Sequence, residues 1–237
     1  MPTFHITHWK AGSQWVQHVF MGACPQRVVV PTPEMQLGVI DAPPHPGAIY
    51  TPMYLAKSRF EQSAASRAPH RKFIVIRDLR DTLVSWYFSL RHTHNPNPTV
   101  ADHRTVLAEK PTEEGLLYLL AHRDFNGLVN VAASWRDTSE LLIRYEQLVA
   151  EPHVWFGRIF DYCCPEVPPA ARAKAINQGL FESLARRPRG QELRTSHLRK
   201  GIAGDWRNHF TPRIVQEFKG RFGEVLTGLG YGTEGDW

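Results

Sequence analysis

Short apolar runs that alternate with helical patterns constrain the fold of this chain more than any other feature. The run "KFIVI" (72–76) is apolar on both faces, as in a strand that helices cover on each side. Five further runs predict strands: "FHITH" (4–8), "RVVV" (27–30), "GVID" (38–41), "AIY" (48–50) and "ELLIRY" (140–145). Apolar residues at helical spacing predict helices at 13–22, 81–92, 112–124, 127–137, 170–186 and 211–226. The alternation predicts an α/β fold with a central parallel sheet flanked by helices on both faces.

Length and charge narrow the class of protein. A chain of 237 residues is in the usual range for one domain, so we expect residues 1–237 to form a single domain. The net charge of +5 indicates an anionic ligand or an anionic surface as a partner. The basic residues are spread along the chain and do not form a tail, so nucleic-acid binding is not expected.

The sequence also predicts the cellular environment. We see no apolar stretch long enough to span a bilayer and no signal peptide, so we expect no membrane association and a cytoplasmic protein. The three cysteines are too few and too badly spaced for a disulfide framework or a zinc site. A reducing compartment and no bound metal are therefore expected.

The segment "WKAGSQW" (9–15) joins the first predicted strand to a helix, where backbone N–H groups can cradle a phosphate. Gly12 permits close backbone approach, Ser13 and Gln14 can donate hydrogen bonds, and Trp15 offers an aromatic face. Lys10 precedes the glycine, and no G-x-x-x-x-G-K-[ST] is present, so an ATP or GTP site lacks its signature. The alternative interpretation is a helix N-cap at Ser13 followed by a core tryptophan.

A second candidate anion contact follows "KFIVI". Arg77 stands at the carboxyl end of this strand, where a guanidinium suits bidentate recognition of phosphate. Ser85 lies about two helical turns along and could reach the same anion if its helix runs alongside. The alternative is a structural ion pair of Arg77 with Asp78 or Asp81, with no role for Ser85.

The segment "RKGIAGDWRNHF" (199–210) has basic and aromatic residues without any helical or alternating pattern, as in a loop that folds over a doubly charged anion. Together with "KAGSQW" and "IRDLRDTLVSWYFS" (76–89), its order and spacing resemble the cytosolic sulfotransferase family, whose cofactor is 3′-phosphoadenosine 5′-phosphosulfate (PAPS). "LLIRYEQLVAEP" (141–152) and "LFESLARRP" (180–188) also resemble family segments, so the resemblance covers nearly the whole chain.

The resemblance implies a P-loop-like turn that holds the 5′-phosphosulfate and a second group of residues that holds the 3′-phosphate. The residues matched to the turn are Lys10, Ala11, Gly12, Ser13 and Gln14. Those matched to the 3′-phosphate are Arg77, Ser85, Arg199, Lys200 and Gly201. Trp15 and Phe181 match the positions that sandwich adenine, and Tyr145 the position at the base edge. The product would be 3′,5′-bisphosphoadenosine (PAP), and the acceptor a small molecule with a hydroxyl or amine.

The expected catalytic cation is Lys10, because negative charge grows on the departing phosphate. The family's catalytic histidine lies in a K-T-H-L-P segment, and the corresponding stretch here is "AIYTPMYLA" (48–56), where Pro52 takes the place of the histidine. His8, His45 and Asp41 are candidate replacement bases. Phe88, His94 and Tyr118 are candidate acceptor-pocket residues, and His94 is a further candidate base.

Two other functions stay open, and so does the state of assembly. Pro52 also fits a nucleotide-binding protein with little or no transfer activity, and a P-loop kinase is a further enzyme class. The family's K-x-x-x-T-V-x-x-x-E dimer motif keeps Thr211 here but has Arg207, Pro212 and Gln216 at its other places. Either a monomer or a homodimer with different contacts is therefore expected.

Overall fold

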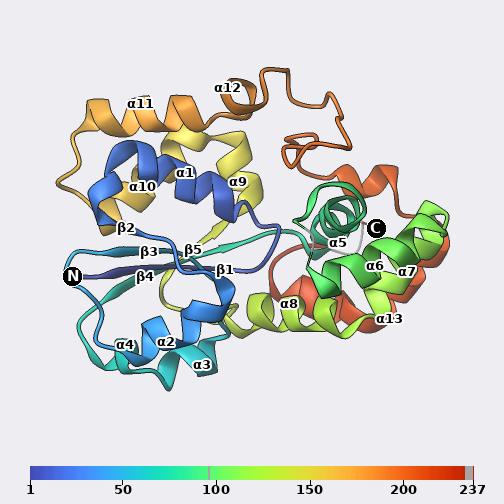
Figure 1. Ribbon diagram of the computed structural model, residues 1–237, viewed down its shortest axis with the longest axis horizontal. Coiled ribbons are helices and arrows are strands. Elements are labelled where there is room, and N and C mark those ends of the chain that lie inside the picture. Colours follow the sequence, from blue (N-terminus) through green and yellow to red (C-terminus); the bar gives the residue numbers. More distant parts are fainter. Residues whose placement is uncertain (96, 233–236) are drawn as a thin grey trace.

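The computed structural model describes residues 1–95, 97–232 and 237. These residues form a five-stranded parallel sheet in the order β2-β3-β1-β4-β5 (Figure 1). The strands are β1 (Thr3–Thr7), β2 (Val28–Val29), β3 (Ile49–Met53), β4 (Arg71–Ile76) and β5 (Leu141–Arg144). The predicted α/β fold is confirmed. The direction in which strands are added reverses at β1, so the carboxyl ends of β1 and its neighbours form the crevice in which such sheets bind ligands.

One predicted strand is wrong. Residues 38–41 belong to helix α2 (Gln36–Asp41), which follows a turn of 3₁₀ helix at Pro33–Met35. Within α2, the buried residues are Gln36 and Ile40, which are four residues apart and so share one helical face. The Gln36 side chain is fixed by hydrogen bonds to the Pro52 carbonyl and from the Tyr54 N–H. Burial at a spacing of four residues is typical of a helix, whereas a strand would bury every second residue.

Helices cover both faces of the sheet, as predicted (Figure 1). One face carries α1 (Ser13–Ala23), α9 (Tyr145–Ala150), α10 (Pro152–Cys163) and α11 (Pro169–Gly179), and the other carries α2, α3 (Lys57–Glu61) and α4 (Ala64–Arg67). Along β4, Phe73 and Val75 enter the core beneath α1 and α10, whereas Ile74 and Ile76 enter the opposite core. The doubly apolar pattern of "KFIVI" therefore reflects a central strand with two buried faces.

The remaining helices gather beyond the carboxyl edge of the sheet (Figure 1). They are α5 (Leu79–Phe88), α6 (Pro98–Ala108), α7 (Thr112–Ala121), α8 (Arg123–Ser134) and α13 (Pro212–Gly228). A π-helical turn, Ser89–Thr93, continues α5. The predicted helix at 170–186 is interrupted at Leu180, after which α12 (Phe181–Ala185) begins, and the sequence patterns missed α6 and α10. Among the described residues, no helix combines the length and apolar character needed to cross a bilayer.

Candidate functional site

The turn after β1 leaves the N-terminus of α1 open. Lys10 and Gly12 both have positive φ angles, 70° and 82°. Gly12, not Ser13, is the N-cap residue and no side chain caps this end, so the alternative of a Ser13 cap is wrong. The Ser13 hydroxyl instead accepts a hydrogen bond from the Tyr54 hydroxyl at 3.0 Å. The first N–H groups of the helix therefore have no side-chain partner from a cap, which suits an anion.

Gly12 is required by a close contact as well as by its φ angle. A Cβ atom at this position would lie 2.8 Å from the Tyr145 ring, closer than real Cβ contacts allow. Tyr145 also packs edge-on against Trp15, with ring centroids 6.2 Å apart. The turn thus brings three of the residues that the resemblance matched to the cofactor into direct contact.

Arg77 is buried at the carboxyl end of β4 and faces the same turn. Its Nη1 donates to the Lys10 carbonyl at 3.1 Å, and its guanidinium lies over the Tyr145 ring at 4.4 Å. Its Nη2 is 3.6 Å from the Asp81 carboxylate, so the predicted structural ion pair exists with Asp81. The other candidate, Asp78, binds Arg80 at 2.8 Å. The Arg77 Nε is buried and has no hydrogen-bond partner in the part of the chain that is described, so the guanidinium keeps binding capacity.

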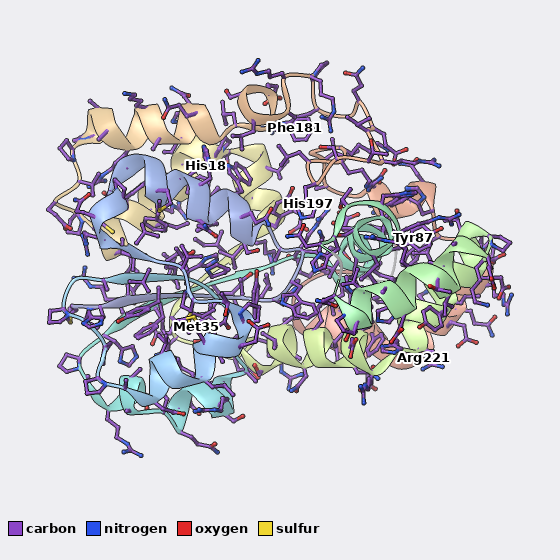
Figure 2. The ribbon with its side chains drawn as sticks, in the orientation of Figure 1. His18, Met35, Tyr87, Phe181, His197 and Arg221 are labelled. Atoms are coloured by element: carbon purple, nitrogen blue, oxygen red, sulfur yellow. The ribbon has the colours of Figure 1, made fainter. Side chains whose placement is uncertain are left out.

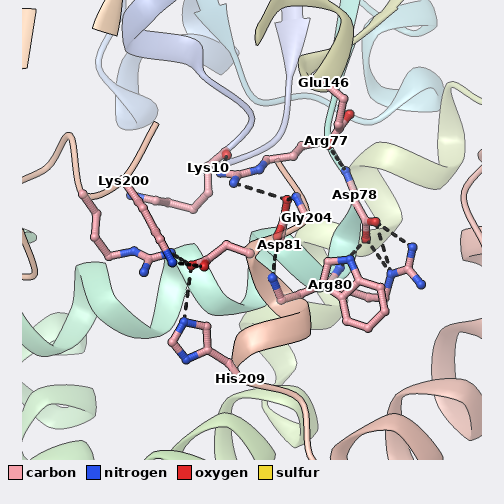
Figure 3. A network of polar contacts seen from close by, with 12 residues as sticks. Lys10, Arg77, Asp78, Arg80, Asp81, Glu146, Lys200, Gly204 and His209 are labelled. Carbon is pink, nitrogen blue, oxygen red and sulfur yellow. Dashed lines mark hydrogen bonds and ion pairs between the residues drawn. The ribbon is translucent and has the colours of Figure 1, made fainter. Parts of the chain in front are cut away.

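Asp81 connects this arginine to the distant segment 199–210. Its side chain is buried in α5, where one carboxylate oxygen accepts from the Gly204 N–H at 2.7 Å and the other from the Trp206 N–H at 2.9 Å (Figure 3). Trp206 is itself buried and packs on the Arg80 guanidinium at 4.0 Å. The "RKG" loop is consequently fixed alongside α5 and Arg77. Ser85 is half-buried one helical turn after Asp81, on the same helix face.

Acidic groups hold the cations of this loop in position. Arg199 forms ion pairs with Glu192 and Asp205. The Lys200 ammonium lies 2.5 Å from Asp205 (Figure 3). Burial alone would raise the pKa of Asp205, but hydrogen bonds from His209, Lys200, Asn208 and Arg199 lower it well below its usual value. Asp205 therefore stays ionised at neutral pH and orients both basic side chains.

Gly201 is the residue at which the "RKG" loop contacts Phe181, one of the residues matched to the adenine site. Its φ is 68°, and a Cβ here would lie 2.4 Å from the Phe181 ring, so only glycine fits. Phe181 opens α12 and is buried (Figure 2). Gly179, two residues earlier, lies against Trp15, because a Cβ there would be 3.3 Å from the Trp15 Nε1. Phe181 and Trp15 thus approach the same region from different elements.

Lys10 is the point at which these segments converge. Burial, and then the charges of Arg77 and Arg199, lower the pKa of Lys10 to about 8. Cations from three segments far apart in the sequence therefore act on one another at the carboxyl edge of the sheet. Figure 3 shows Lys10 next to Arg77. Of the other residues matched to the turn, Ala11 is buried and Gln14 is exposed. Such a cluster, which we call the cationic cradle (Lys10, Arg77 and Arg199), is stabilised when an anion enters it.

A cavity of about 550 Å³ adjoins the cationic cradle. His8, Trp9 and Tyr54 line it from the sheet, while Trp86, Leu90 and His94 line it from α5 and the segment that follows. His94 is the predicted pocket residue that lines it. Phe88 is instead buried below the Arg199 guanidinium, 4.4 Å away, and Tyr118 lies behind the wall, bonded at 3.0 Å to His103.

The structure distinguishes the candidate bases. Both nitrogens of His8 are occupied, since Nδ1 lies 2.9 Å from the Trp9 carbonyl and Nε2 accepts from the Arg77 N–H at 3.1 Å. Burial lowers the pKa of His8 to about 4. Asp41 ends a helix instead of a strand and pairs with Arg59 on the surface at 2.5 Å. His45 is exposed and precedes β3, at the amino edge of the sheet, opposite the cradle.

His94 has the better placement for proton transfer. It lines the cavity, and its ring lies 6.2 Å from that of His197, at 25° to it. Burial lowers the pKa of His94, and the charges of Lys10, His197 and Arg104 lower it further, so the imidazole is neutral at pH 7. Figure 2 shows His197 between the layer that contains α1 and helix α5. The charge of Lys10, a member of the cationic cradle, therefore acts on a histidine that lines the cavity.

Sequence reasoning missed Trp9, Tyr54 and Trp86 as cavity residues. For Tyr54 the available signal was its position two residues after Pro52, within the stretch already compared with the family's catalytic segment. Trp86 lies on α5 next to Ser85 and five residues after Asp81, so the helix that positions the "RKG" loop also lines the cavity.

The fold and the site define the class: an α/β protein with a cluster of cations at the switch point of a parallel sheet, next to a cavity. Residues 3–230 match the family model described as "Sulfotransferase domain", and the chain belongs to this family.

Two curated relatives are plant proteins. The chain is 25% identical to cytosolic sulfotransferase 3 of Arabidopsis thaliana over 171 residues, which is 65% of this chain and 52% of the relative. It is 28% identical to cytosolic sulfotransferase 8 of the same organism over 118 residues, 43% of this chain and 36% of the relative. The matches therefore span about half or less of those relatives.

Solved structures have the same fold. Mouse sulfotransferase SULT7A1 complexed with PAP superposes with a TM-score of 0.70 at 20% identity, covering 95% of this chain and 83% of that one. Retinol dehydratase in complex with androsterone and the inactive cofactor PAP gives a TM-score of 0.57 at 16% identity, covering 99% and 83%.

We predict that Asp81→Asn loosens the "RKG" loop. An asparagine offers one oxygen where the carboxylate offers two, so one of the Gly204 and Trp206 N–H groups faces an NH₂. We expect faster hydrogen exchange at these two amides and a loss of about 1–3 kcal/mol in the free energy of unfolding. Asp102→Asn, the same change at an exposed position of α6, is the control. Unchanged exchange at both amides would contradict the tether.

We predict that Lys10→Met stabilises the ligand-free protein at pH 7. The folded-state pKa of about 8 is below the ordinary value of 10.5, so the unfolded chain binds more protons between these values. Wild-type stability should rise with pH across this window. Lys10→Met should be about 1–3 kcal/mol more stable than wild type below pH 8, with the difference shrinking toward pH 10.5. Urea unfolding at pH 7 and pH 10 measures it.

The control for this experiment is Lys174→Met on the exposed side of α11. A Lys10→Met protein that is less stable than wild type at pH 7 would show that the lysine is not strained by the neighbouring cations.

Proposed function

We propose that this chain is a PAPS-dependent sulfotransferase that moves a sulfuryl group to a hydroxyl or amine of a small-molecule acceptor. The observation that carries the proposal is the convergence of Lys10, Arg77 and Arg199 beside a cavity of about 550 Å³. The curated relatives are cytosolic sulfotransferases, and both structural neighbours were solved with PAP. A cytoplasmic location and a single domain over 1–237 belong to the same proposal.

The residues present fit a nucleotide with phosphate at both ends of its ribose. Arg77 keeps an unpartnered Nε, α1 begins without a side-chain cap, and Gly12 and Gly201 allow close approach. Arg77, Ser85, Arg199, Lys200 and Gly201 would hold the 3′-phosphate. Lys10, Ala11, Gly12, Ser13 and Gln14 would form the P-loop-like turn for the 5′ end, with Trp15, Phe181 and Tyr145 around adenine. When bound, PAPS supplies the sulfuryl group on a phosphate leaving group.

Each residue of the chain then has a defined task. The Lys10 ammonium stabilises negative charge that develops beside the turn, at a position where burial and the charges of Arg77 and Arg199 lower its pKa to about 8. The aromatic walls Trp9, Tyr54 and Trp86 orient the acceptor and exclude water. His94, neutral at pH 7, accepts the acceptor's proton at a ring nitrogen. His8 holds the backbone of Arg77 through its Nε2.

In this proposal His94 takes over the role of the family's catalytic histidine, whose position in this chain is occupied by Pro52. The base then reaches the acceptor from the segment after α5 instead of from β3. This favours a transferase over the alternative of a nucleotide-binding protein with little activity. For assembly, the Thr211 hydroxyl bonds to Glu113 and caps α13 within the chain, so Thr211 already has intramolecular partners. A monomer, or a homodimer through other contacts, stays a prediction.

The function is tested with radiolabelled PAPS and a panel of phenols, alcohols and amines. We expect transfer to at least one class, and thermal stabilisation by PAP well above that by ATP. Arg199→Met should weaken PAP binding about 10–100-fold, because a charge-assisted contact to phosphate is lost, while binding of adenosine 5′-phosphosulfate, which lacks the 3′-phosphate, changes much less. Equal stabilisation by ATP and PAP would contradict the proposal.

The base is tested separately with His94→Gln. We expect kcat to fall about 10²–10⁴-fold with PAP affinity unchanged, because general-base catalysis contributes about this much. The decline of activity at acid pH that reports protonation of His94 should also disappear. His18→Gln, at an exposed position of α1, is the matched control and should retain wild-type kinetics. A His94→Gln enzyme with wild-type kcat and pH profile would remove His94 from the mechanism and leave the sulfotransferase assignment intact.

A further inference from the structure

Three side chains of metal-ligating type meet at the cavity wall formed by α6 and α8. His103 comes from α6, His122 is the N-cap residue of α8, and Asp124 lies in the first turn of α8. One ligand atom from each lies within 4.8 Å of those of the other two. His103 and Asp124 line the cavity, whereas the proposed transfer mechanism uses none of the three.

The distances suit a small tetrahedral ion. His103 Nε2 lies 3.4 Å, and His122 Nδ1 lies 3.6 Å, from the same Asp124 oxygen, Oδ2. Ligands at about 2.0–2.1 Å from a tetrahedral zinc ion are about 3.3–3.4 Å from one another. Closing the cluster around an ion therefore needs shifts of a few tenths of an ångström at these two pairs.

His103 has the kind of hydrogen-bonding and packing partners that orient a metal-ligating histidine. Its Nδ1 lies 3.0 Å from the Tyr118 hydroxyl, and its ring packs edge-on against Trp86 with centroids 5.6 Å apart. If the Nδ1 proton is donated to Tyr118, the Nε2 lone pair points toward Asp124 and His122. The side chain is only 2% exposed, so this orientation is fixed by packing.

The charge of Asp124 is only weakly compensated. Its cationic neighbour Arg123 is 3.8 Å away, and that side chain is 92% exposed, so the pair contributes little. A second cluster of potential ligands, Glu192, Asp205 and His209, differs in this respect, because Arg199 and Lys200 already pair with its carboxylates. The first cluster can therefore accept a cation without displacing a buried ion pair.

We propose that His103 Nε2, His122 Nδ1 and an Asp124 carboxylate oxygen bind one divalent transition-metal ion of the zinc type. Two imidazoles and a carboxylate are the ligands such ions prefer, and three protein ligands leave a fourth position open. That position takes a water molecule. The ion displaces two weak interactions, the 3.2 Å hydrogen bond from the Asp124 N–H to His122 Nδ1 and the 3.4 Å contact between His103 Nε2 and Asp124 Oδ2.

This site is independent of the proposed transfer chemistry, and the sequence patterns predicted no metal. Metal motifs were sought at cysteines, whereas these ligands come from α6 and from the start of α8. The juxtaposition depends on how the two helices pack and is not expressed in a local spacing.

The full-length chain, freed of metal with a chelator, is titrated with Co²⁺ and followed by visible absorption. We expect the intense bands of tetrahedral cobalt at one ion per chain, and their loss when Zn²⁺ is added. His122→Asn and Asp124→Asn should each weaken Co²⁺ binding at least 10-fold. Asparagine preserves the helix cap at 122 and the side-chain volume at 124, so both variants should fold.

Two controls separate this site from other metal binding. Glu192→Gln removes a member of the second cluster and His18→Asn an exposed imidazole, and both should bind Co²⁺ like wild type. Circular dichroism verifies that every variant is folded. The proposal is overturned by the absence of a stoichiometric tetrahedral spectrum, by wild-type affinity in both His122→Asn and Asp124→Asn, or by a loss confined to Glu192→Gln. None of these outcomes bears on sulfuryl transfer, which is measured separately.

Discussion

The Asp81 carboxylate is the group on which the arrangement of the site depends. It is almost completely buried, and a buried charge is costly unless it is paired and hydrogen-bonded. Its partners are the N–H groups of Gly204 and Trp206 and, more distantly, Arg77. Because the two N–H groups belong to the "RKG" loop and Arg77 to the end of β4, satisfying this one carboxylate positions both segments. Asp205 repeats the principle within the loop, where it orients Arg199 and Lys200.

The same construction leaves positive charge uncompensated at Lys10. The acids of the site face Arg77, Arg199 and Lys200, and the effect of burial and of the neighbouring arginines on Lys10 is a pKa of about 8. Burial beside two arginines therefore disfavours the charged form of Lys10 at the place where, in the proposed function, an anion enters. Preorganised charge of this kind reduces stability without ligand and strengthens binding, because no reorganisation is needed when the anion arrives.

Local features allowed much of this to be predicted from the sequence. The two buried faces of "KFIVI", the glycine before α1 and an arginine at a strand end are each set by nearby residues, and the fold agrees with them. The prediction for "GVID" was wrong because a run of four residues with only two apolar side chains, Val39 and Ile40, fits either a strand or one helical turn, and the contacts of Gln36 decide between them. His8 was an attractive base at a strand end, but its bond from the Arg77 N–H joins the residues that follow two neighbouring strands, β1 and β4, and this pairing is not visible in the sequence. The cavity wall was missed for a similar reason: it depends on packing between helices, such as Trp86 on Phe125, with centroids 6.1 Å apart.

The residues around Pro52 indicate why a proline can stand at the position of the family's histidine. Tyr54, two residues on, still connects this strand to the anion turn through its bond to Ser13, so β3 keeps a structural connection to the turn. In the proposed mechanism the proton acceptor is on the opposite wall, at His94, beyond the π-helical turn that ends α5. The ring of His197 stacks near that of His94, and His197 precedes Arg199 by two residues in the chain. In the proposed function the "RKG" loop contacts the cofactor through Arg199, so the segment that holds the donor also contributes His197 to the surroundings of His94.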